Sequence, residues 1–231
     1  MSQMHSLSRL MGVDSFKALI TMKLLEVQSS VRQDGSVSRA LSDEFIQAWQ
    51  GNQAVKSQIQ HRQRDVGFEP PAHPTALWTQ ANYTAPEARS PDMTNALSKS
   101  EELIEELLWA DYLVLGVPMY NFSVPCTLKA YLDNIIRINR TFSFDPTTHA
   151  FRGLVEGKKA LIITPSAGDF TSSTPLAHMN FCDTYLKSVL GFIGIHNVTV
   201  VAAPNQFMAD DAREQSTQAA RKALMQLAEQ W

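Results

Sequence analysis

The sequence predicts a single doubly wound α/β domain, in which helices cover both faces of a five-stranded parallel sheet. Strand-like and helix-like stretches alternate five times along the chain, which is typical of parallel sheets. Two strand-like stretches, 112–117 and 160–165, are apolar at nearly every position, as in strands buried on both faces. The chain has 231 residues, which is enough for one sizeable core, and it shows no internal repeat.

In chain order, the first strand is expected at residues 23–28, and a polar loop rich in hydroxyl groups follows it. The next helix places three large apolar side chains on one face: Leu41, Phe45 and Trp49. A weaker strand is expected within residues 55–63, toward an edge of the sheet. Residues 64–91 form a connector with five prolines, and connectors of this length usually carry a function or cover part of the domain. We expect it to pack through three apolar side chains: Leu77, Trp78 and Tyr83.

The central strand has a helix on either side of it. The capping box Ser98-x-x-Glu101 predicts the start of the helix before this strand. Pro118 ends the strand, because proline cannot donate a hydrogen bond to the ladder. The following helix is expected to begin near Pro125, since proline suits the first helical turn.

The last third of the chain repeats this alternation. Residues 160–165 form the fourth strand, and residues 198–203 form the fifth. The helix between them contains Phe181, and a second capping box at Asp211 predicts the start of a final helix.

Composition excludes several classes of function. The 20 basic and 23 acidic residues give a net charge of −3 without long charged blocks, so neither nucleic acid nor an anionic membrane is expected as a partner. No apolar run approaches the roughly 20 residues that span a bilayer. Cys126 and Cys182 lie far apart without metal-ligand spacing, so no disulfide framework and no metal site are expected. This cysteine usage favours a reducing, cytoplasmic location.

The first 21 residues have neither a clean apolar core nor a small-residue cleavage site, so they do not predict a secretory signal. We expect a disordered extension at residues 1–21, ahead of a single domain at residues 22–231. A native appendage, including a transit peptide, is the alternative.

The loop after the first strand predicts an anion site. Ser30, Ser36 and Ser38 supply hydroxyl groups just before a helix, and the free N–H groups and dipole of a helix N-terminus favour a phosphate. No glycine-rich dinucleotide fingerprint or Gly-Lys-Ser loop is present. An ordinary helix cap at Ser36 or Ser38 is the alternative interpretation.

Two more loops are expected at the same edge of the sheet. Met119-Tyr-Asn-Phe122 follows the central strand, and Ser166-Ala-Gly-Asp169 follows the fourth strand. Aromatic side chains and backbone amides suit the face and the edge of a planar ring. A planar ligand that carries a phosphate and binds where the strand order of such a sheet reverses is expected to be FMN.

Several short motifs occur together in one order and spacing. They are Ser30 with Ser36-Val-Ser38; Met119-Tyr-Asn-Phe122 with Leu128-Lys129 and Tyr131; Arg137 with Thr141-Phe142; Gly153-Leu-Val-x-Gly-Lys-Lys159; and Leu190-Gly-Phe-Ile-Gly-Ile195. With these motifs the chain resembles the FMN-dependent NADH azoreductases, also described as NADH:quinone oxidoreductases. The resemblance runs from Met22 onward and is weakest across residues 50–95.

This resemblance implies a flavodoxin-like fold with strand order 2-1-3-4-5 and a homodimer with two FMN sites near its interface. It assigns phosphate and ribityl contacts to Ser30, Ser36, Val37 and Ser38. Ring contacts fall on Met119, Tyr120, Asn121 and Phe122, and further contacts fall on Pro165, Ser166, Ala167 and Gly168. Phe142, Phe144 and the apolar connector are candidate dimer contacts.

The chain departs from the family pattern at three positions. Pro165 stands where serine is usual, whereas Ala167 and Asn139 stand where glycine is usual. Proline lacks an N–H group and alanine disfavours positive φ, so either residue is expected to weaken flavin binding or to tilt the flavin ring. Of the backbone donors left in this loop, the Gly168 N–H is the best placed to stabilise negative charge on the flavin.

The resemblance implies that electrons pass from NADH through FMN to a quinone or an azo compound, by ping-pong kinetics in one shared pocket. No catalytic side chain is identified. His178 is the one histidine expected near the pocket, with a surface or packing role as the alternative. Two other functions stay open: a flavodoxin-type electron carrier, which is usually far more acidic, and a non-catalytic FMN-binding protein.

Overall fold

The computed structural model describes residues 20–52 and 57–231. Of the expected extension at residues 1–21, only the last two residues are described, and they begin the first strand. Five parallel strands form one sheet in the order β2-β1-β3-β6-β7, which is the predicted order when the strands of this sheet are counted alone. Their bounds are Ile20–Gln28 (β1), Ser57–Asp65 (β2), Tyr112–Gly116 (β3), Lys159–Pro165 (β6) and Asn197–Ala203 (β7).

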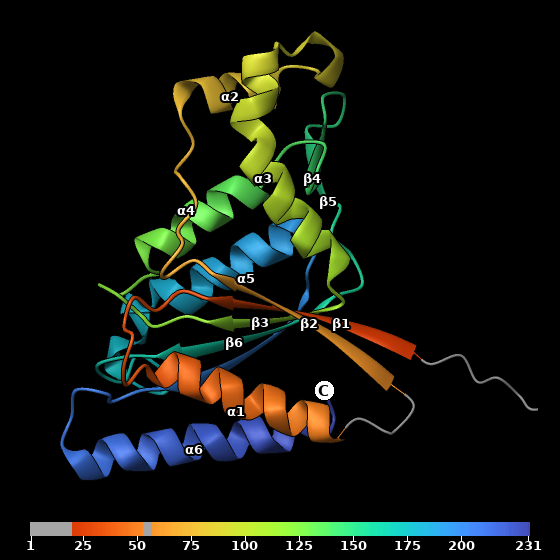
Figure 1. The fold of residues 1–231 in the computed structure, drawn as a ribbon. Coiled ribbons are helices and arrows are strands. Elements are labelled where there is room, and N and C mark those ends of the chain that lie inside the picture. Colours follow the sequence, from red (N-terminus) through yellow and green to blue (C-terminus); the bar gives the residue numbers. More distant parts are fainter. Residues whose placement is uncertain (1–19, 53–56) are drawn as a thin grey trace, which may run out of the picture.

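Helices cover both faces of this sheet (Figure 1). One face carries α1 (Val37–Asn52) and α6 (Asp210–Ala228), and the other carries α3 (Pro91–Trp109), α4 (Cys126–Ile135) and α5 (Phe181–Ile193). The shorter helical elements are α2 (Ala76–Tyr83) and two 3-10 helices, Pro86–Ala88 and Pro175–Met179. Within the described residues, no helix has the length and apolar character to span a bilayer.

Each face of the sheet has its own apolar core, because side chains alternate along the strands. Leu25 and Val27 of β1 pack with α3, α4 and α5, whereas Leu24 packs with α1 and α6. As predicted, the apolar face of α1 is buried, with Leu41, Phe45 and Trp49 at most 1% exposed.

Two predicted helix starts are wrong. α3 begins at Pro91, seven residues before Ser98, and the Ser90 hydroxyl accepts the Met93 N–H at 3.3 Å. Proline at the first helical position and serine before it form an earlier start signal that outweighs the Ser98 box. α6 begins at Asp210 after Ala209, without a side-chain cap.

The proline-rich connector packs on the body, as expected, but through fewer side chains than predicted. It contains α2, which lies against the far end of α3 (Figure 1). Trp78 and Ala81 of α2 are buried against Leu97, whereas Leu77 and Tyr83 are 40% and 72% exposed. The prediction for Leu77 and Tyr83 is therefore wrong, because a short helix buries only one face.

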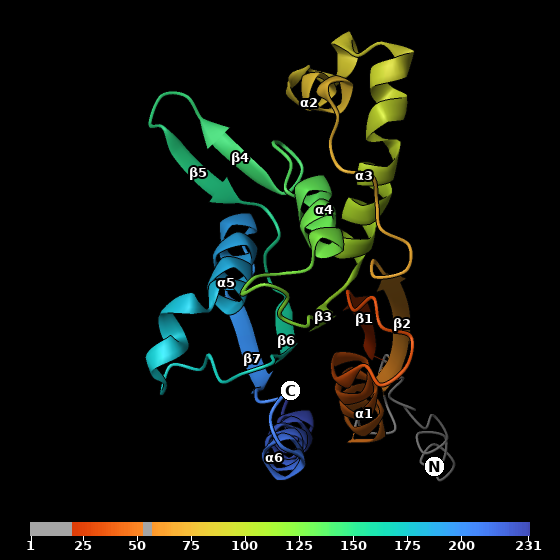
Figure 2. The same cartoon turned by 90° about the vertical axis from the view of Figure 1, so that its left-hand side faces the viewer.

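A β-hairpin that the sequence did not predict projects beside α5 (Figure 2). It consists of β4 (Phe142–Asp145) and β5 (Ala150–Gly153), which pair in antiparallel fashion. Its strands have four residues each and its loop lacks an Asn-Gly turn signal, so alternation alone was too short to reveal it. Asn139, just before the hairpin, has φ 59°, a conformation that asparagine tolerates better than most residues.

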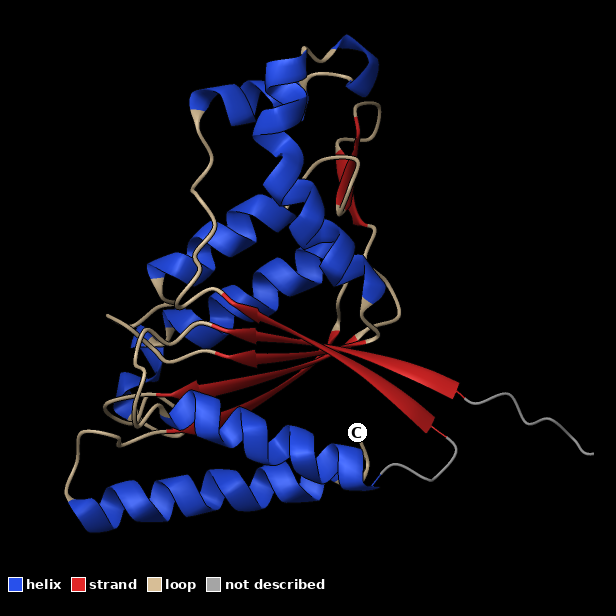
Figure 3. Cartoon of the chain, viewed as in Figure 1, coloured by secondary structure: helices blue, strands red, loops and turns tan. Residues whose placement is uncertain are grey.

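All five parallel strands end at the same edge, and the loops that follow them gather there (Figure 3). This edge is where open α/β sheets bind their ligands. The predicted loops after β1, β3 and β6 are therefore neighbours in the structure.

Candidate functional site

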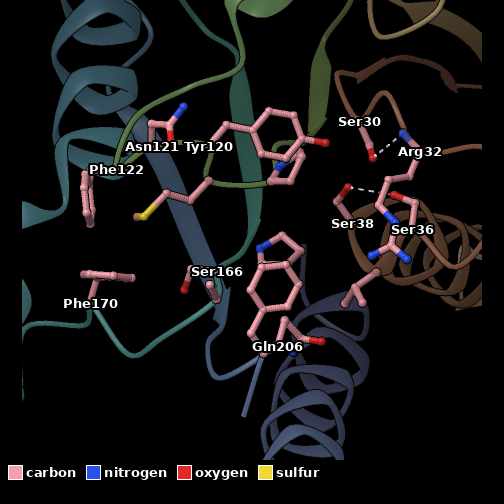
Figure 4. A pocket seen from close by; sticks show the side chains of 16 residues that line it. Ser30, Arg32, Ser36, Ser38, Tyr120, Asn121, Phe122, Ser166, Phe170 and Gln206 are labelled. Atoms are coloured by element: carbon pink, nitrogen blue, oxygen red, sulfur yellow. Dashed lines mark hydrogen bonds between the residues drawn. The ribbon is translucent and has the colours of Figure 1, made fainter.

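A pocket of about 560 Å³ opens at the carboxyl ends of β1, β3 and β6. All of the predicted site residues except Gly168 line it: Ser30, Ser36, Val37, Ser38, Met119, Tyr120, Asn121, Phe122, Pro165, Ser166 and Ala167. Figure 4 shows that its two ends differ. Ser36, Ser38 and Arg32 lie at one end, and Phe122 and Phe170 lie at the other.

The polar end is built from the loop after β1 and the start of α1. Ser36 Oγ and Ser38 Oγ are 3.3 Å apart, and Ser30 Oγ accepts the Arg32 N–H at 3.3 Å. The first amides of α1, from Val37 onward, have no carbonyl partner inside the helix. Hydroxyl groups, free amides, a helix dipole and an exposed guanidinium together form a site for an anion.

The loop at this end is anchored to the central strand. The Ser29 amide and hydroxyl both donate to the carbonyl oxygen of Gly116, at 3.1 and 2.9 Å. The chain therefore leaves β1 in a fixed direction toward the pocket.

The aromatic end is built on a two-residue turn. Tyr120 and Ser123 exchange backbone hydrogen bonds of 2.9 and 3.0 Å, with Asn121 and Phe122 between them at φ 48° and 70°. Such turns normally take glycine or asparagine, and a left-handed residue other than glycine costs roughly 1–2 kcal/mol. Phe122 therefore holds a strained backbone, a feature that clusters at functional sites.

Neighbouring backbone groups hold this turn in place. The Phe181 N–H donates to the Phe122 carbonyl at 3.0 Å, and the Met119 N–H donates to the Pro165 carbonyl at 2.9 Å. The ring of Phe122 meets the ring of Phe170 edge to face, with centroids 5.6 Å apart. The turn thus presents aromatic surface in a fixed orientation.

The end of β6 and the loop that follows it accommodate the two unusual residues, Pro165 and Ala167. The Pro165 carbonyl accepts a hydrogen bond from the Met119 N–H, so this contact does not need the N–H group that proline lacks. Ala167 is not among the described residues with positive φ, and its carbonyl accepts the Phe207 N–H at 3.1 Å. The expected strain at Ala167 is therefore absent.

Gly168 is the one predicted residue that does not line the pocket. Its carbonyl accepts the Ser166 hydroxyl at 2.8 Å, which closes the loop after β6. The Ser166 N–H donates to Ala203 within the sheet at 3.2 Å, so it is not free for a ligand.

Five lining residues were missed from the sequence: Arg32, Pro118, Phe170, Gln206 and Phe207. A basic residue among hydroxyls was a usable signal for Arg32. Gln206 and Phe207 follow β7, a loop that the three-loop prediction left out. His178 does not line the pocket; it is exposed, and its Nδ1 lies 2.9 Å from the Pro175 carbonyl, so it has the surface role given as the alternative.

A family model described as flavodoxin-like fold matches residues 22–228. The chain belongs to this family. An "FMN-dependent NADH:quinone oxidoreductase" from Nostoc punctiforme is 43% identical over 210 residues, which cover 91% of this chain and all of the relative. A relative with the same name from Hydrogenovibrio crunogenus is 40% identical over 201 residues, 87% of this chain and 96% of that protein.

Two solved structures share the fold of this chain. An azoreductase from Bacillus anthracis has a TM-score of 0.81 at 22% identity, and the match covers 91% of this chain and 100% of that one. An FMN-dependent NADH-azoreductase from the same species, in complex with FMN, has a TM-score of 0.76 at 21% identity, covering 90% and 99%.

Proposed function

We propose that this flavodoxin-like protein is an FMN-dependent oxidoreductase that passes electrons from NADH to quinones or azo compounds. The observation that carries the proposal is one pocket with an anion-binding end and an aromatic end, at the carboxyl edge of the sheet. Relatives that align over nine-tenths of this chain are named as FMN-dependent NADH:quinone oxidoreductases, which supports the same activity here.

The residues of the pocket fit FMN, a planar ring joined to a phosphate by a ribityl chain. Ser36, Ser38 and Arg32 would hold the phosphate, because hydroxyl, amide and guanidinium donors all face an anion favourably. Asn121 and Phe122 would lie against the ring. The remaining predicted contacts, Ser30, Val37, Met119, Tyr120, Pro165, Ser166 and Ala167, line the space between or beside these ends.

When bound, FMN supplies the two-electron redox chemistry. The protein's part is to bind and orient: the polar end fixes one end of the cofactor, and the strained turn fixes the aromatic wall at the other. Gly168 stays a proposed contact through its backbone, because it follows Ser166 and Ala167, which line the pocket. Since one open pocket would serve donor and acceptor in turn, we expect ping-pong kinetics.

Flavin absorbance tests this function. The purified protein should take up added FMN, lose the yellow colour with NADH under anaerobic conditions, and regain it with a benzoquinone. A yellow protein that NADH does not bleach would instead support an electron carrier or a non-catalytic binder. A protein that is colourless after incubation with excess FMN and removal of the unbound flavin would contradict the proposal.

We further propose that the protein forms a homodimer through the β4–β5 hairpin. Phe142, Phe144, Phe151 and Phe192 form one aromatic patch there, with neighbouring ring centroids 4.8–6.1 Å apart. Phe151 is 60% exposed, and contiguous exposed apolar surface usually marks an interface. Light scattering should give a dimer mass for the wild type and a monomer mass for Phe151→Ser. A cytoplasmic location is also proposed, since both cysteines are free thiols.

A further inference from the structure

A charged pair outside the pocket lies directly behind its polar end. Arg39 of α1 forms a bidentate pair with Asp65 at the end of β2, at 2.5 and 2.9 Å. Both side chains are mostly buried, with 17% and 21% of their surfaces exposed. The ring of Phe68 packs on the guanidinium at 4.2 Å. Neither Arg39 nor Asp65 lines the pocket.

Arg39 also holds the backbone of the pocket loop. Its Nη2 donates to the carbonyl oxygen of Ser30 at 2.6 Å. Gly67 packs against the same carbonyl so closely that an added Cβ would overlap it. The Ser30 carbonyl is therefore held by Arg39 and enclosed by Gly67, two residues that do not line the pocket, whereas Ser30 does line it.

Asp65 keeps this arrangement rigid. Besides Arg39, its Oδ1 accepts the backbone N–H groups of Gly67 and Phe68 at 3.0 and 3.1 Å. Burial alone would raise the pKa of Asp65, but the hydrogen bonds from Arg39 and these amides lower it below its usual value. Asp65 therefore stays ionised near neutral pH, and both the guanidinium and the turn after β2 stay fixed.

An anion site needs donors toward the ligand and carbonyl oxygens away from it, because a carbonyl oxygen carries partial negative charge. We propose that Arg39 and Asp65 are positioning residues for the phosphate of FMN: they hold the Ser30 carbonyl outside the pocket and so preorganise the loop. This inference rests on the proposed function. The pair acts through geometry, since the charge of Arg39 is already matched by Asp65.

Affinity for FMN and for riboflavin, which lacks the phosphate, separates this role from a general loss of stability. Arg39→Gln should weaken FMN binding about tenfold in a fluorescence titration, the size of one lost hydrogen bond to a charged group. Riboflavin binding should stay unchanged. Arg221→Gln is the matched control, because it removes another bidentate pair, to Glu44 at 2.5 and 2.9 Å, and neither residue of that pair lines the pocket. It should change neither affinity.

Asp65→Asn distinguishes positioning from charge, and it also decides the matter if Arg39→Gln does not fold. If the pair acts by position, Asp65→Asn weakens FMN binding. If Arg39 acts by charge, removing the opposing carboxylate tightens FMN binding, and the inference is overturned. Unchanged FMN affinity in both variants, or an equal loss for riboflavin, would also overturn it. Failure of the proposed function looks different, because it is seen in the wild type itself: the wild type would then either bind no flavin or hold FMN that NADH does not bleach.

Discussion

The two ends of the pocket are held in place by different means. At the polar end, side chains position the backbone: Ser29 reaches Gly116, and Arg39 reaches Ser30. At the aromatic end, the backbone positions the side chains, through two left-handed residues and hydrogen bonds to neighbouring segments. The polar end should therefore respond to changes in side-chain donors and charge, and the aromatic end should respond to changes in backbone freedom.

The largest effect on FMN affinity is expected at Gly67, where the polar end of the pocket leaves no space for a side chain. Gly67→Ala would place a methyl group on the carbonyl of Ser30, a backbone atom that cannot move without shifting the pocket loop. We expect FMN affinity to fall about a hundredfold and stability to fall by about 1–3 kcal/mol. Flavin titration and thermal unfolding measure the two effects.

Gly51→Ala provides the control for Gly67→Ala. A Cβ at Gly51, in the last turn of α1, meets nothing within 4 Å. This change should leave FMN affinity unaltered and raise stability by up to about 1 kcal/mol, since alanine favours a helix. Equal FMN affinity in both variants would mean that the position of the Ser30 carbonyl does not matter.

A smaller effect is expected from the hydroxyl groups at the polar end. Ser36→Ala and Ser38→Ala should each weaken FMN binding up to about tenfold, because each removes one donor to a charged phosphate. Affinity for riboflavin should not change in either variant. If both serines only cap the helix, thermal stability would fall and the preference for FMN over riboflavin would stay.

The fold could largely be predicted because its signals are apolar and local. Residues 112–117 and 160–165 are apolar at nearly every position because both faces are buried, and the burial of Leu41, Phe45 and Trp49 follows from their spacing. The start of α3 was mispredicted because Ser90 and Ser98 offered competing caps. Local sequence does not show the packing that also decides where a helix begins. The hairpin was missed because its strands are short and its aromatic rings pack on Phe192 of α5, a contact that local sequence does not show.

The site could be predicted only in part, because its polar end depends on side chains and its aromatic end depends on backbone conformation. Hydroxyls near a helix start are visible in a sequence, so Ser36 and Ser38 were found. The positive φ of Phe122 could not be predicted, because phenylalanine does not favour this backbone conformation. Arg39 and Asp65 lie in separate elements, and only the pairing of β1 with β2 brings the end of β2 beside the loop.

Charge at the open side of the polar end should have a modest effect. Arg32 is exposed, so Arg32→Gln should weaken FMN binding only about two- to fivefold, in line with solvent-screened pairs. The same change should reduce the sensitivity of FMN affinity to salt. Arg62→Gln removes the same charge from an exposed side chain on β2 that does not line the pocket, and it should alter neither property. A loss as large as that of Gly67→Ala would show that Arg32 is a principal phosphate ligand.

The smallest net effect is expected at Phe122, and its sign tests how the aromatic end is held. Phe122→Gly and Phe122→Ala both remove the ring contact with Phe170, but only glycine relieves the strain at φ 70°. At an ordinary position the alanine variant is the more stable, by about 0.4–1 kcal/mol. Here we expect the reverse, with the glycine variant more stable by about 1 kcal/mol and close to the wild type. If thermal unfolding ranks alanine above glycine, the ring contacts and not the backbone hold the turn, and the contrast between the two ends of the pocket fails.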